Sequence, residues 1–227
     1  MADLIHGLRP ATVRANLETV RSEIAAAADR AGRDAGKIEV CAATKYLPVE
    51  ELGALAEAGV TLVGENRAQD LEAKVAAHGD RFAWDFIGQL QSRKVKQIVP
   101  HVRLIHSLAS ESALDQLERQ AGAARPGLEA LVEVDVSGEE GKAGVSPDAL
   151  ARFLGRSPVG GIVPITGLMT MPPLASDPEA SRPFFARLRD LAGAHGLARL
   201  SMGTTQDYLV AVEEGATIVR IGTRLYG

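Results

Sequence analysis

Residues 60–99, VTLVGENRAQDLEAKVAAHGDRFAWDFIGQLQSRKVKQIV, decide the fold of this chain. The stretch holds two short apolar runs, residues 60–63 and 83–87, and each is followed by a helix-forming segment, residues 67–78 and 92–99. Alternation of this kind favours a parallel sheet covered by helices, because parallel strands need a crossover connection between them. We therefore expect the same unit to recur on both sides of this stretch.

The alternation does continue in both directions. Further strands are predicted at residues 38–44, 102–106, 129–136, 165–168, 199–202 and 217–221, and further helices at 111–121, 147–154, about 184–195 and 205–214. Eight units predict a single closed (β/α)8 barrel of the TIM type, which usually needs about 200 to 250 residues. A doubly wound open sheet is the alternative, but no G-x-G-x-x-G motif follows the first strand.

An amphipathic helix precedes the first predicted strand. Val13, Leu17, Val20 and Ile24 recur at helical spacing after Pro10, and Gly32 is a suitable stop. We expect this extra N-terminal helix to pack on a single domain that spans residues 1–227, with no room for a second domain.

Composition and charge exclude several functional classes. The chain of 227 residues is 46% hydrophobic and 24% charged, with a net charge of −4 and no block of basic residues, so nucleic acid is not an expected partner. A single cysteine, Cys41, and a polar N-terminus indicate a cytoplasmic protein without a secretory segment. The longest uncharged stretch, residues 157–176, contains four prolines and is predicted as a strand with its loops rather than a membrane span. The five histidines lack metal-ligand spacing, and we expect no metal.

Lys45 is the first candidate for chemistry. In such barrels the reactive groups lie at the carboxyl ends of the strands, and Lys45 ends the first one with the same side-chain parity as Cys41 and Ala43. If that face points inward, the amine enters a small, dry volume that favours a nucleophile able to form a Schiff base. The alternative is a lysine that only opens a solvated loop.

The ends of the seventh and eighth strands form a candidate phosphate site. Residues 200–205 and 219–223 combine small residues with the hydroxyls of Ser201, Thr205 and Thr223. Small residues let backbone N–H groups approach an anion, and barrels often bind phosphate at this place. A simpler interpretation is that Thr204 and Asp207 cap a helix and Gly222 forms a turn.

Arg220 lies in otherwise apolar company two residues before Gly222, and a buried guanidinium needs a partner. That partner is either a carboxylate, such as Glu65 or Asp207, or a ring nitrogen of a bound cofactor. A lysine amine, a phosphate cradle and a polar group between them describe a pocket for a phosphorylated aldehyde, for which pyridoxal 5′-phosphate (PLP) is the candidate.

Seven ordered segments carry a resemblance to a known family. They are residues 43–45 (ATK), 64–66 (GEN), 86–92 (FIGQLQS) with Lys94, 136–140 (VSGEE) with Lys142 and Gly144, 167–173 (GLMTMPP), 201–203 (SMG) with Asp207, and 219–223 (VRIGT). From about residue 38 to the C-terminus, the sequence resembles the pyridoxal phosphate homeostasis proteins.

The resemblance implies a single-domain barrel related to the N-terminal domain of alanine racemase, with PLP held as an internal aldimine on Lys45. It also implies that Arg220 faces the pyridine nitrogen and that Asn66 lies beside the cofactor. The phosphate site that it implies consists of Ser201, Gly203, Thr205, Gly222 and Thr223. Such proteins are thought to buffer PLP and deliver it to apo-enzymes, without an established turnover reaction.

Five residues at three places depart from the family pattern. Gln89 stands where many members have histidine, Thr204 and Thr205 replace a methionine and a serine, and Tyr46 with Leu47 replaces a more polar pair. Thr205 keeps the hydroxyl that the phosphate contact needs, whereas Gln89 removes a titratable group.

Besides a cofactor carrier, two other functions stay open at the level of sequence. A PLP-dependent racemase of low activity is disfavoured, because racemisation needs a base on each face of the carbanion and we expect no additional domain to supply one. A cofactor-free lyase would use Lys45 directly on a sugar phosphate. A further hypothesis is that Lys94 or Lys142 accepts the cofactor during transfer.

Two further expectations concern the whole molecule. We expect a monomer or weak homodimer, and the loop at residues 169–177 is either a lid or a static cover.

Overall fold

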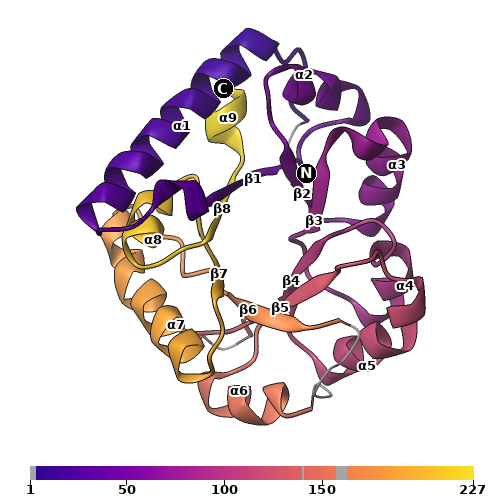
Figure 1. Ribbon diagram of the computed structural model, residues 1–227, viewed down its shortest axis with the longest axis vertical. Coiled ribbons are helices and arrows are strands. Elements are labelled where there is room, and N and C mark those ends of the chain that lie inside the picture. The colour runs from indigo at the N-terminus through magenta and orange to yellow at the C-terminus, as the bar shows by residue number, and fades with distance from the viewer. Residues whose placement is uncertain (1–3, 140, 157–162) are drawn as a thin grey trace.

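The computed structural model describes residues 4–139, 141–156 and 163–227, which form a closed barrel of parallel strands inside a layer of helices (Figure 1). The strands of the described chain follow one another around the barrel in sequence order: β1 (Glu39–Ala43), β2 (Leu62–Glu65), β3 (Ala83–Phe86), β4 (Leu104–Leu108), β5 (Glu129–Glu133), β6 (Ile165–Met169), β7 (Arg199–Thr204) and β8 (Ile218–Ile221). Pairing of β1 with β8 closes the barrel and confirms the predicted (β/α)8 fold.

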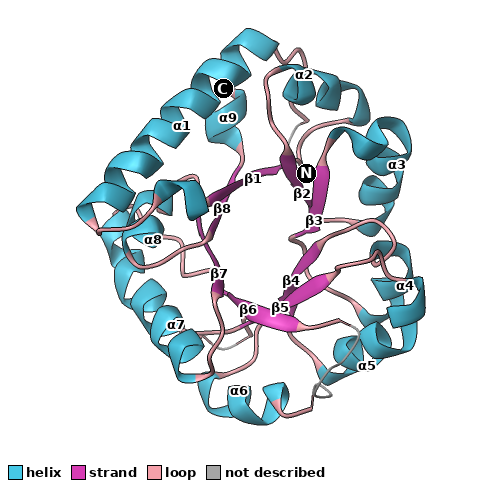
Figure 2. Cartoon of the chain, in the orientation of Figure 1, coloured by secondary structure: helices cyan, strands magenta, loops and turns pink. Residues whose placement is uncertain are grey.

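Helices surround the strands on every side of the barrel (Figure 2). They are α1 (Pro10–Arg30), α2 (Leu52–Glu57), α3 (Ala68–His78), α4 (Val95–Ile98), α5 (Glu111–Gln120), α6 (Pro147–Leu154), α7 (Arg182–Ala194), α8 (Tyr208–Glu213) and α9 (Thr223–Tyr226). Short 3₁₀ turns lie at η1 (Ala35–Lys37), η2 (Val49–Glu51), η3 (Gly79–Arg81), η4 (Ser92–Lys94), η5 (Ala121–Ala123) and η6 (Pro178–Ser181).

The predicted extra helix is α1, which packs against α8 and α9. Its buried side chains are Val13, Leu17, Val20, Ile24, Ala27 and Ala28, which lie on one face at helical spacing. Helix α9 after the last strand has only 4 residues, and α1 lies across it on the outside (Figure 1). The long first helix therefore covers the side of the barrel where β8 meets β1.

Side chains alternate between the inside of the barrel and the helix layer, as the period of a strand requires. The apolar cluster inside the barrel consists of Cys41, Leu62, Leu104, Leu131, Met169 and Ile218, one from each of six strands. The larger core lies between the strands and the helices and includes the neighbouring residues Ala42, Val63, Ile105 and Val132. Cys41 thus points inward. Cys41, Ala43 and Lys45 share one face by sequence parity, and the structure confirms the inward direction of that face for Cys41.

The prediction missed two helices, α2 and α9. Both are short, with 6 and 4 residues, and lack repeated apolar spacing, and Pro48 before α2 is typical of a loop. In the uncharged stretch of residues 157–176, the predicted strand is β6, and residues 157–162 lie outside the described part. In the described residues, no helix has the length and apolarity to cross a membrane, and no group of three or more metal-ligating side chains is found there.

Candidate functional site

Lys45 lies two residues after the end of β1, at the carboxyl end of the barrel. Its side chain is exposed, and Nζ lies 4.7 Å from the centroid of the neighbouring Tyr46 ring. The expectation of a dry volume is therefore wrong for this structure, because the strand ends just before Lys45 and the side chain leaves the packed interior. The amine is instead accessible at the mouth of the barrel.

A buried carboxylate holds together the ends of β1 and β2. Glu65 Oε2 accepts a hydrogen bond from Thr44 Oγ1 at 2.9 Å and forms an ion pair with Lys74 of α3. Lys74 Nζ also donates to the Thr44 carbonyl at 2.9 Å, and both charged side chains are almost fully buried. This network fixes the backbone directly before Lys45, and no sequence argument identified it. The available signal was the place of Lys74, one turn after the buried Leu71 on α3.

Asn66 follows β2 and is held by the same carboxylate, since its backbone N–H donates to Glu65 Oε1 at 2.7 Å. Its side-chain oxygen Oδ1 is buried and has no hydrogen-bond partner among the described residues. A buried polar atom without a partner is costly in a folded protein. Asn66 therefore offers an acceptor for a ligand at this end of the barrel.

The loops after β7 and β8 meet at the same mouth. Thr205 Oγ1 accepts a hydrogen bond from the Gly222 backbone N–H at 3.2 Å, which joins the two loops, and Thr223 begins α9. Gly203 has φ of +90°, and a Cβ at this position would lie 2.5 Å from the Ala211 side chain. Only glycine fits such a close, left-handed turn without displacing its neighbours.

Thr204 and Asp207 also interact, as the simpler interpretation of this segment expects. Asp207 Oδ1 accepts from the Thr204 backbone N–H at 2.7 Å, and Asp207 Oδ2 accepts from Ser181 Oγ at 2.9 Å. Since the same segment also contributes Gly203 and Thr205 to the mouth, this local pairing and a binding role for the loop are compatible.

Arg220 is buried inside the barrel on β8, with 6% of its surface exposed. Its guanidinium donates to Ser201 Oγ, to the Thr170 carbonyl at 3.1 Å and to Met171 Sδ at 2.8 Å. Burial lowers the pKa of Arg220, yet a guanidinium keeps its charge in proteins.

The sequence leaves open whether a carboxylate is the partner of Arg220. Among the described residues, none forms an ion pair with it: Glu65 is paired with Lys74, and Asp207 accepts from Thr204 and Ser181. Arg220 thus remains a buried cation with donors directed toward the carboxyl end of the barrel.

Ser201 occupies a different place from the one expected. Its hydroxyl is fully buried in the barrel interior, where it accepts from Arg220 and lies 2.7 Å from His106 Nδ1. Successive side chains of β7 alternate between the interior and the helix layer, and Ser201 occupies an interior position. A direct hydrogen bond from this hydroxyl to a phosphate at the mouth is therefore not supported, and we correct that expectation.

Glu133 is a residue of the mouth that sequence reasoning missed. It ends β5 with the inward parity of Leu131, and its side chain is half-buried. Burial raises the pKa of Glu133, while the nearby charge of Arg220 opposes that rise. Its parity with the apolar interior positions was the signal that could have identified it.

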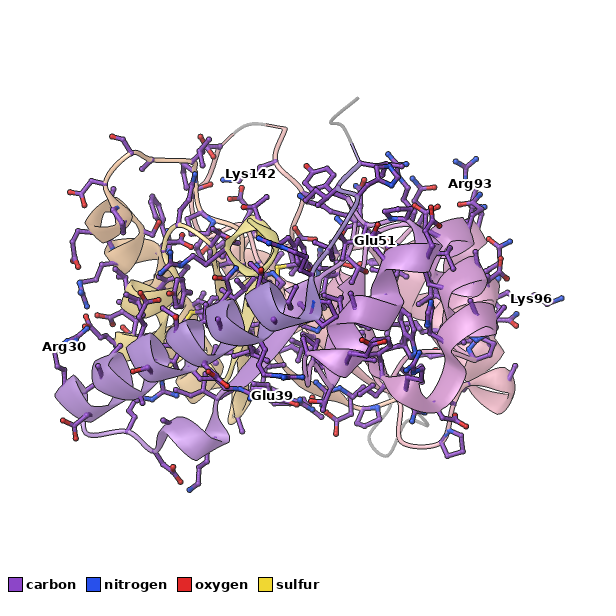
Figure 3. All side chains as sticks on the ribbon, turned by 90° about the horizontal axis from the view of Figure 1, so that it is seen from above. Arg30, Glu39, Glu51, Arg93, Lys96 and Lys142 are labelled. Carbon is purple, nitrogen blue, oxygen red and sulfur yellow. The ribbon has the colours of Figure 1, made fainter. Side chains whose placement is uncertain are left out.

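Lys94 and Lys142, the two lysines considered for transfer, have partners in their own segments. Lys142 Nζ pairs with Glu139 at 2.6 Å, and Lys94 Nζ donates to Gln97 Oε1 at 3.0 Å. In the side view of Figure 3, Lys142 lies at the upper end of the barrel, opposite Glu39, which starts β1 at the lower end. Gln89, where the sequence departs from the resemblance, is exposed after β3.

Together these residues give the mouth a defined chemistry. It combines an accessible primary amine, an unpartnered amide oxygen, a buried cation and two joined loops of small residues. The orphaned Asn66 oxygen would accept from a donor group of a ligand, such as a hydroxyl, and the carboxylate-free Arg220 would donate to an acceptor group of the same ligand. The residues present therefore fit a phosphorylated aldehyde.

Comparison with known proteins first defines the class. The family model described as "Alanine racemase, N-terminal domain" matches residues 14–227. The structure of alanine racemase from Corynebacterium glutamicum has a TM-score of 0.69 at 15% identity, covering 100% of this chain and 64% of that one, which is a likeness of fold. The fold and the lysine-bearing mouth thus define a barrel of the alanine racemase N-terminal class.

More similar proteins narrow the class to one family. The pyridoxal phosphate homeostasis protein of Aquifex aeolicus is 39% identical over 218 residues, covering 93% of this chain and 96% of the relative. PipY of Synechococcus elongatus, solved without PLP, has a TM-score of 0.82 at 31% identity, covering 95% of this chain and 100% of PipY. Its PLP-bound structure has a TM-score of 0.79. This chain belongs to the pyridoxal phosphate homeostasis protein family, as the sequence predicts.

Proposed function

We propose that this chain binds PLP at the carboxyl ends of its strands and serves in the cytoplasm to buffer PLP and deliver it to apo-enzymes. One observation carries the proposal: the accessible Lys45 amine and the buried, carboxylate-free Arg220 both occur at the same barrel mouth. PipY, a relative with the same fold, has been solved with PLP bound. The chain works as a single unit of residues 1–227, as a monomer or weak homodimer.

Each residue of the mouth has a distinct task in this proposal. Lys45 would hold PLP covalently, because a primary amine condenses with an aldehyde to give a C=N bond and water. Arg220 would offer a hydrogen-bond donor to the pyridine nitrogen, and Asn66 would lie beside the ring. Gly203, Thr205, Gly222 and Thr223 would hold the phosphate, in the two loops that the hydrogen bond from the Gly222 N–H to Thr205 Oγ1 joins.

We further propose that the protein is not an enzyme. When bound, PLP serves catalysis as an electron sink, and a protonated pyridine nitrogen strengthens that role. A guanidinium facing this nitrogen opposes its protonation, because two positive charges would meet in a buried site. The buried Arg220, without a carboxylate to neutralise it, supports a carrier rather than a catalyst.

The visible absorption spectrum tests the proposal. We expect the purified protein mixed with PLP to show a yellow band that borohydride reduction removes, leaving the cofactor covalently attached. Lys45→Ala should show neither the band nor the attachment. Lys96→Ala is a matched control, because Lys96 points away from the molecule (Figure 3) and should behave as wild type.

Two results would contradict parts of this proposal. A protein that stays colourless with PLP would favour a lyase that uses Lys45 directly on a sugar phosphate. Formation of D-alanine from L-alanine at a turnover typical of enzymes would favour a racemase over a carrier.

A further inference from the structure

A chain of buried side chains crosses the barrel interior beneath Arg220. Asp85 on β3, His106 on β4 and Ser201 on β7 have no exposed surface, and each contacts the next. His106 Nε2 lies 3.0 Å from Asp85 Oδ2, His106 Nδ1 lies 2.7 Å from Ser201 Oγ, and Arg220 donates to Ser201 Oγ. We call these four residues the interior chain.

The directions of these hydrogen bonds are fixed by chemistry. Arg103 donates to both oxygens of Asp85, at 2.9 and 3.1 Å, so Asp85 is a carboxylate that only accepts. The proton of His106 is therefore on Nε2. Burial lowers the pKa of His106, so the ring is neutral and Nδ1 accepts from the Ser201 hydroxyl. The Ser201 oxygen then presents lone pairs to Arg220.

The interior chain thus ends on the cation that faces the ligand site. A serine hydroxyl rotates freely unless its proton has an acceptor, and His106 Nδ1 is that acceptor. With the proton held there, Ser201 can only accept from Arg220. The opposite end is anchored, because Arg103 also pairs with Glu39 at 2.6 Å, at the amino ends of the strands.

We propose that His106 is a positioning residue: through Ser201 it holds the Arg220 guanidinium in place for the pyridine nitrogen of PLP. This inference rests on the proposed function, and it goes beyond it by assigning a role to residues that do not touch the cofactor. Removing the Ser201 hydroxyl cuts the interior chain at one point and leaves both ends in place.

The positioning role of His106 also predicts that PLP binding depends on pH. A second proton on His106 turns Nδ1 into a donor, so Ser201 must accept from both neighbours and its own proton loses its acceptor. The charged groups that face His106 are Asp85, Arg103 and Arg220, and only Asp85 favours the second proton. Arg220 then shares the Ser201 oxygen with a second donor and lies near an additional positive charge. Acid should therefore weaken the hold of Ser201 on Arg220 and, with it, PLP binding.

The first test needs no cofactor. Nitrogen-15 NMR of the ligand-free protein should show His106 as a neutral ring with the proton on Nε2. In Ser201→Ala the Nδ1 resonance should shift, because its hydrogen-bond donor is gone. A His106 ring with the proton on Nδ1 in the wild type would overturn the proposal without involving PLP.

The second test measures PLP affinity and the pH dependence of the visible spectrum. We expect Ser201→Ala to weaken binding roughly tenfold, the loss expected for one hydrogen bond to a charged group, and to flatten the acid limb of the profile. Ser107→Ala is the matched control, because Ser107 is a buried serine on β4 outside the interior chain. Thermal unfolding of both variants verifies that they are folded.

The outcomes separate the two proposals. Wild-type protein that fails to retain PLP after reduction contradicts the proposed function. Wild-type protein that retains PLP, together with an unchanged affinity and pH profile in Ser201→Ala, contradicts the positioning role. An equal loss in Ser107→Ala would contradict it as well, because any buried serine would then have the same effect.

Discussion

At the scale of single residues, the ion pair between Glu65 and Lys74 connects folding with function. Glu65 accepts hydrogen bonds from Thr44 Oγ1 and the Asn66 backbone N–H, so one carboxylate fixes the ends of the neighbouring strands β1 and β2. A buried ion pair adds little net stability compared with apolar residues, but a buried charge that loses its partner is costly. The pair therefore matters most when only one member is changed.

We expect Lys74→Met to lower the free energy of unfolding by about 3 to 5 kcal/mol, because Glu65 would be buried without a cation. Urea unfolding measures the loss. Replacing both residues, as Glu65→Leu with Lys74→Met, should recover a large part of it, since no charge is then left unpaired. A single variant as stable as wild type would mean that water reaches Glu65.

How far the sequence predicts the site can be judged from these residues. Lys45 and the ends of β7 and β8 were identified because they follow strand ends or carry hydroxyls. The interior chain and Lys74 were missed, because their partners come from strands or helices far apart in sequence. Only the register of the closed barrel brings Asp85, His106 and Ser201 together, and local patterns contain no record of that register. The Ser201 role was wrong for the same reason.

At the scale of elements, α1 covers the side of the barrel that the short α9 would leave exposed. The strands were predictable within a few residues, because short apolar runs between turn signals mark them clearly. The same method found α1, whose apolar spacing persists over 21 residues, and missed α2 and α9, which are too short for any period. Length alone does not decide this, because α4 and α8, with 4 and 6 residues, were predicted from the alternation of strands and helices.

Helix α1 should contribute substantially to stability. Leu17 is 3% exposed, so Leu17→Ala is expected to cost about 2 to 5 kcal/mol of unfolding free energy through lost burial and a residual cavity. Glu18→Ala, on the exposed face of the same helix, should change it little. Chemical denaturation of both variants measures the difference, and equal effects would argue that α1 packs only loosely on the barrel.

At the scale of the whole molecule, buried titratable groups make stability depend on pH. The unfolded chain protonates histidine below about 6.5, whereas His106 in the fold resists because burial lowers its pKa. In that window the unfolded state binds more protons, so the free energy of unfolding decreases as the pH falls. Glu133 acts in the opposite sense above about 4.5, because its raised pKa lets the fold keep a proton.

Unfolding free energies measured in steps below pH 6.5 should therefore decline more steeply for wild type than for His106→Asn. The slope due to one histidine is at most about 1.4 kcal/mol per pH unit. Asparagine keeps an acceptor for Ser201 without a titratable ring, so the difference between the two slopes reports His106 alone. Parallel slopes would show that His106 is protonated as readily in the fold as in the unfolded chain.

The seam between β1 and β8 determines when a folding chain can first form the proposed PLP site. Cys41, four residues before Lys45, lies opposite Arg220 across this seam, so the two ends of the proposed site come from the first and last strands of the barrel. A chain emerging from the ribosome presents Lys45 before β2 and Arg220 only after the other seven strands have been translated. Chains that lack β8 would therefore lack the cation of the proposed site, and capture of the cofactor would report that the barrel has closed.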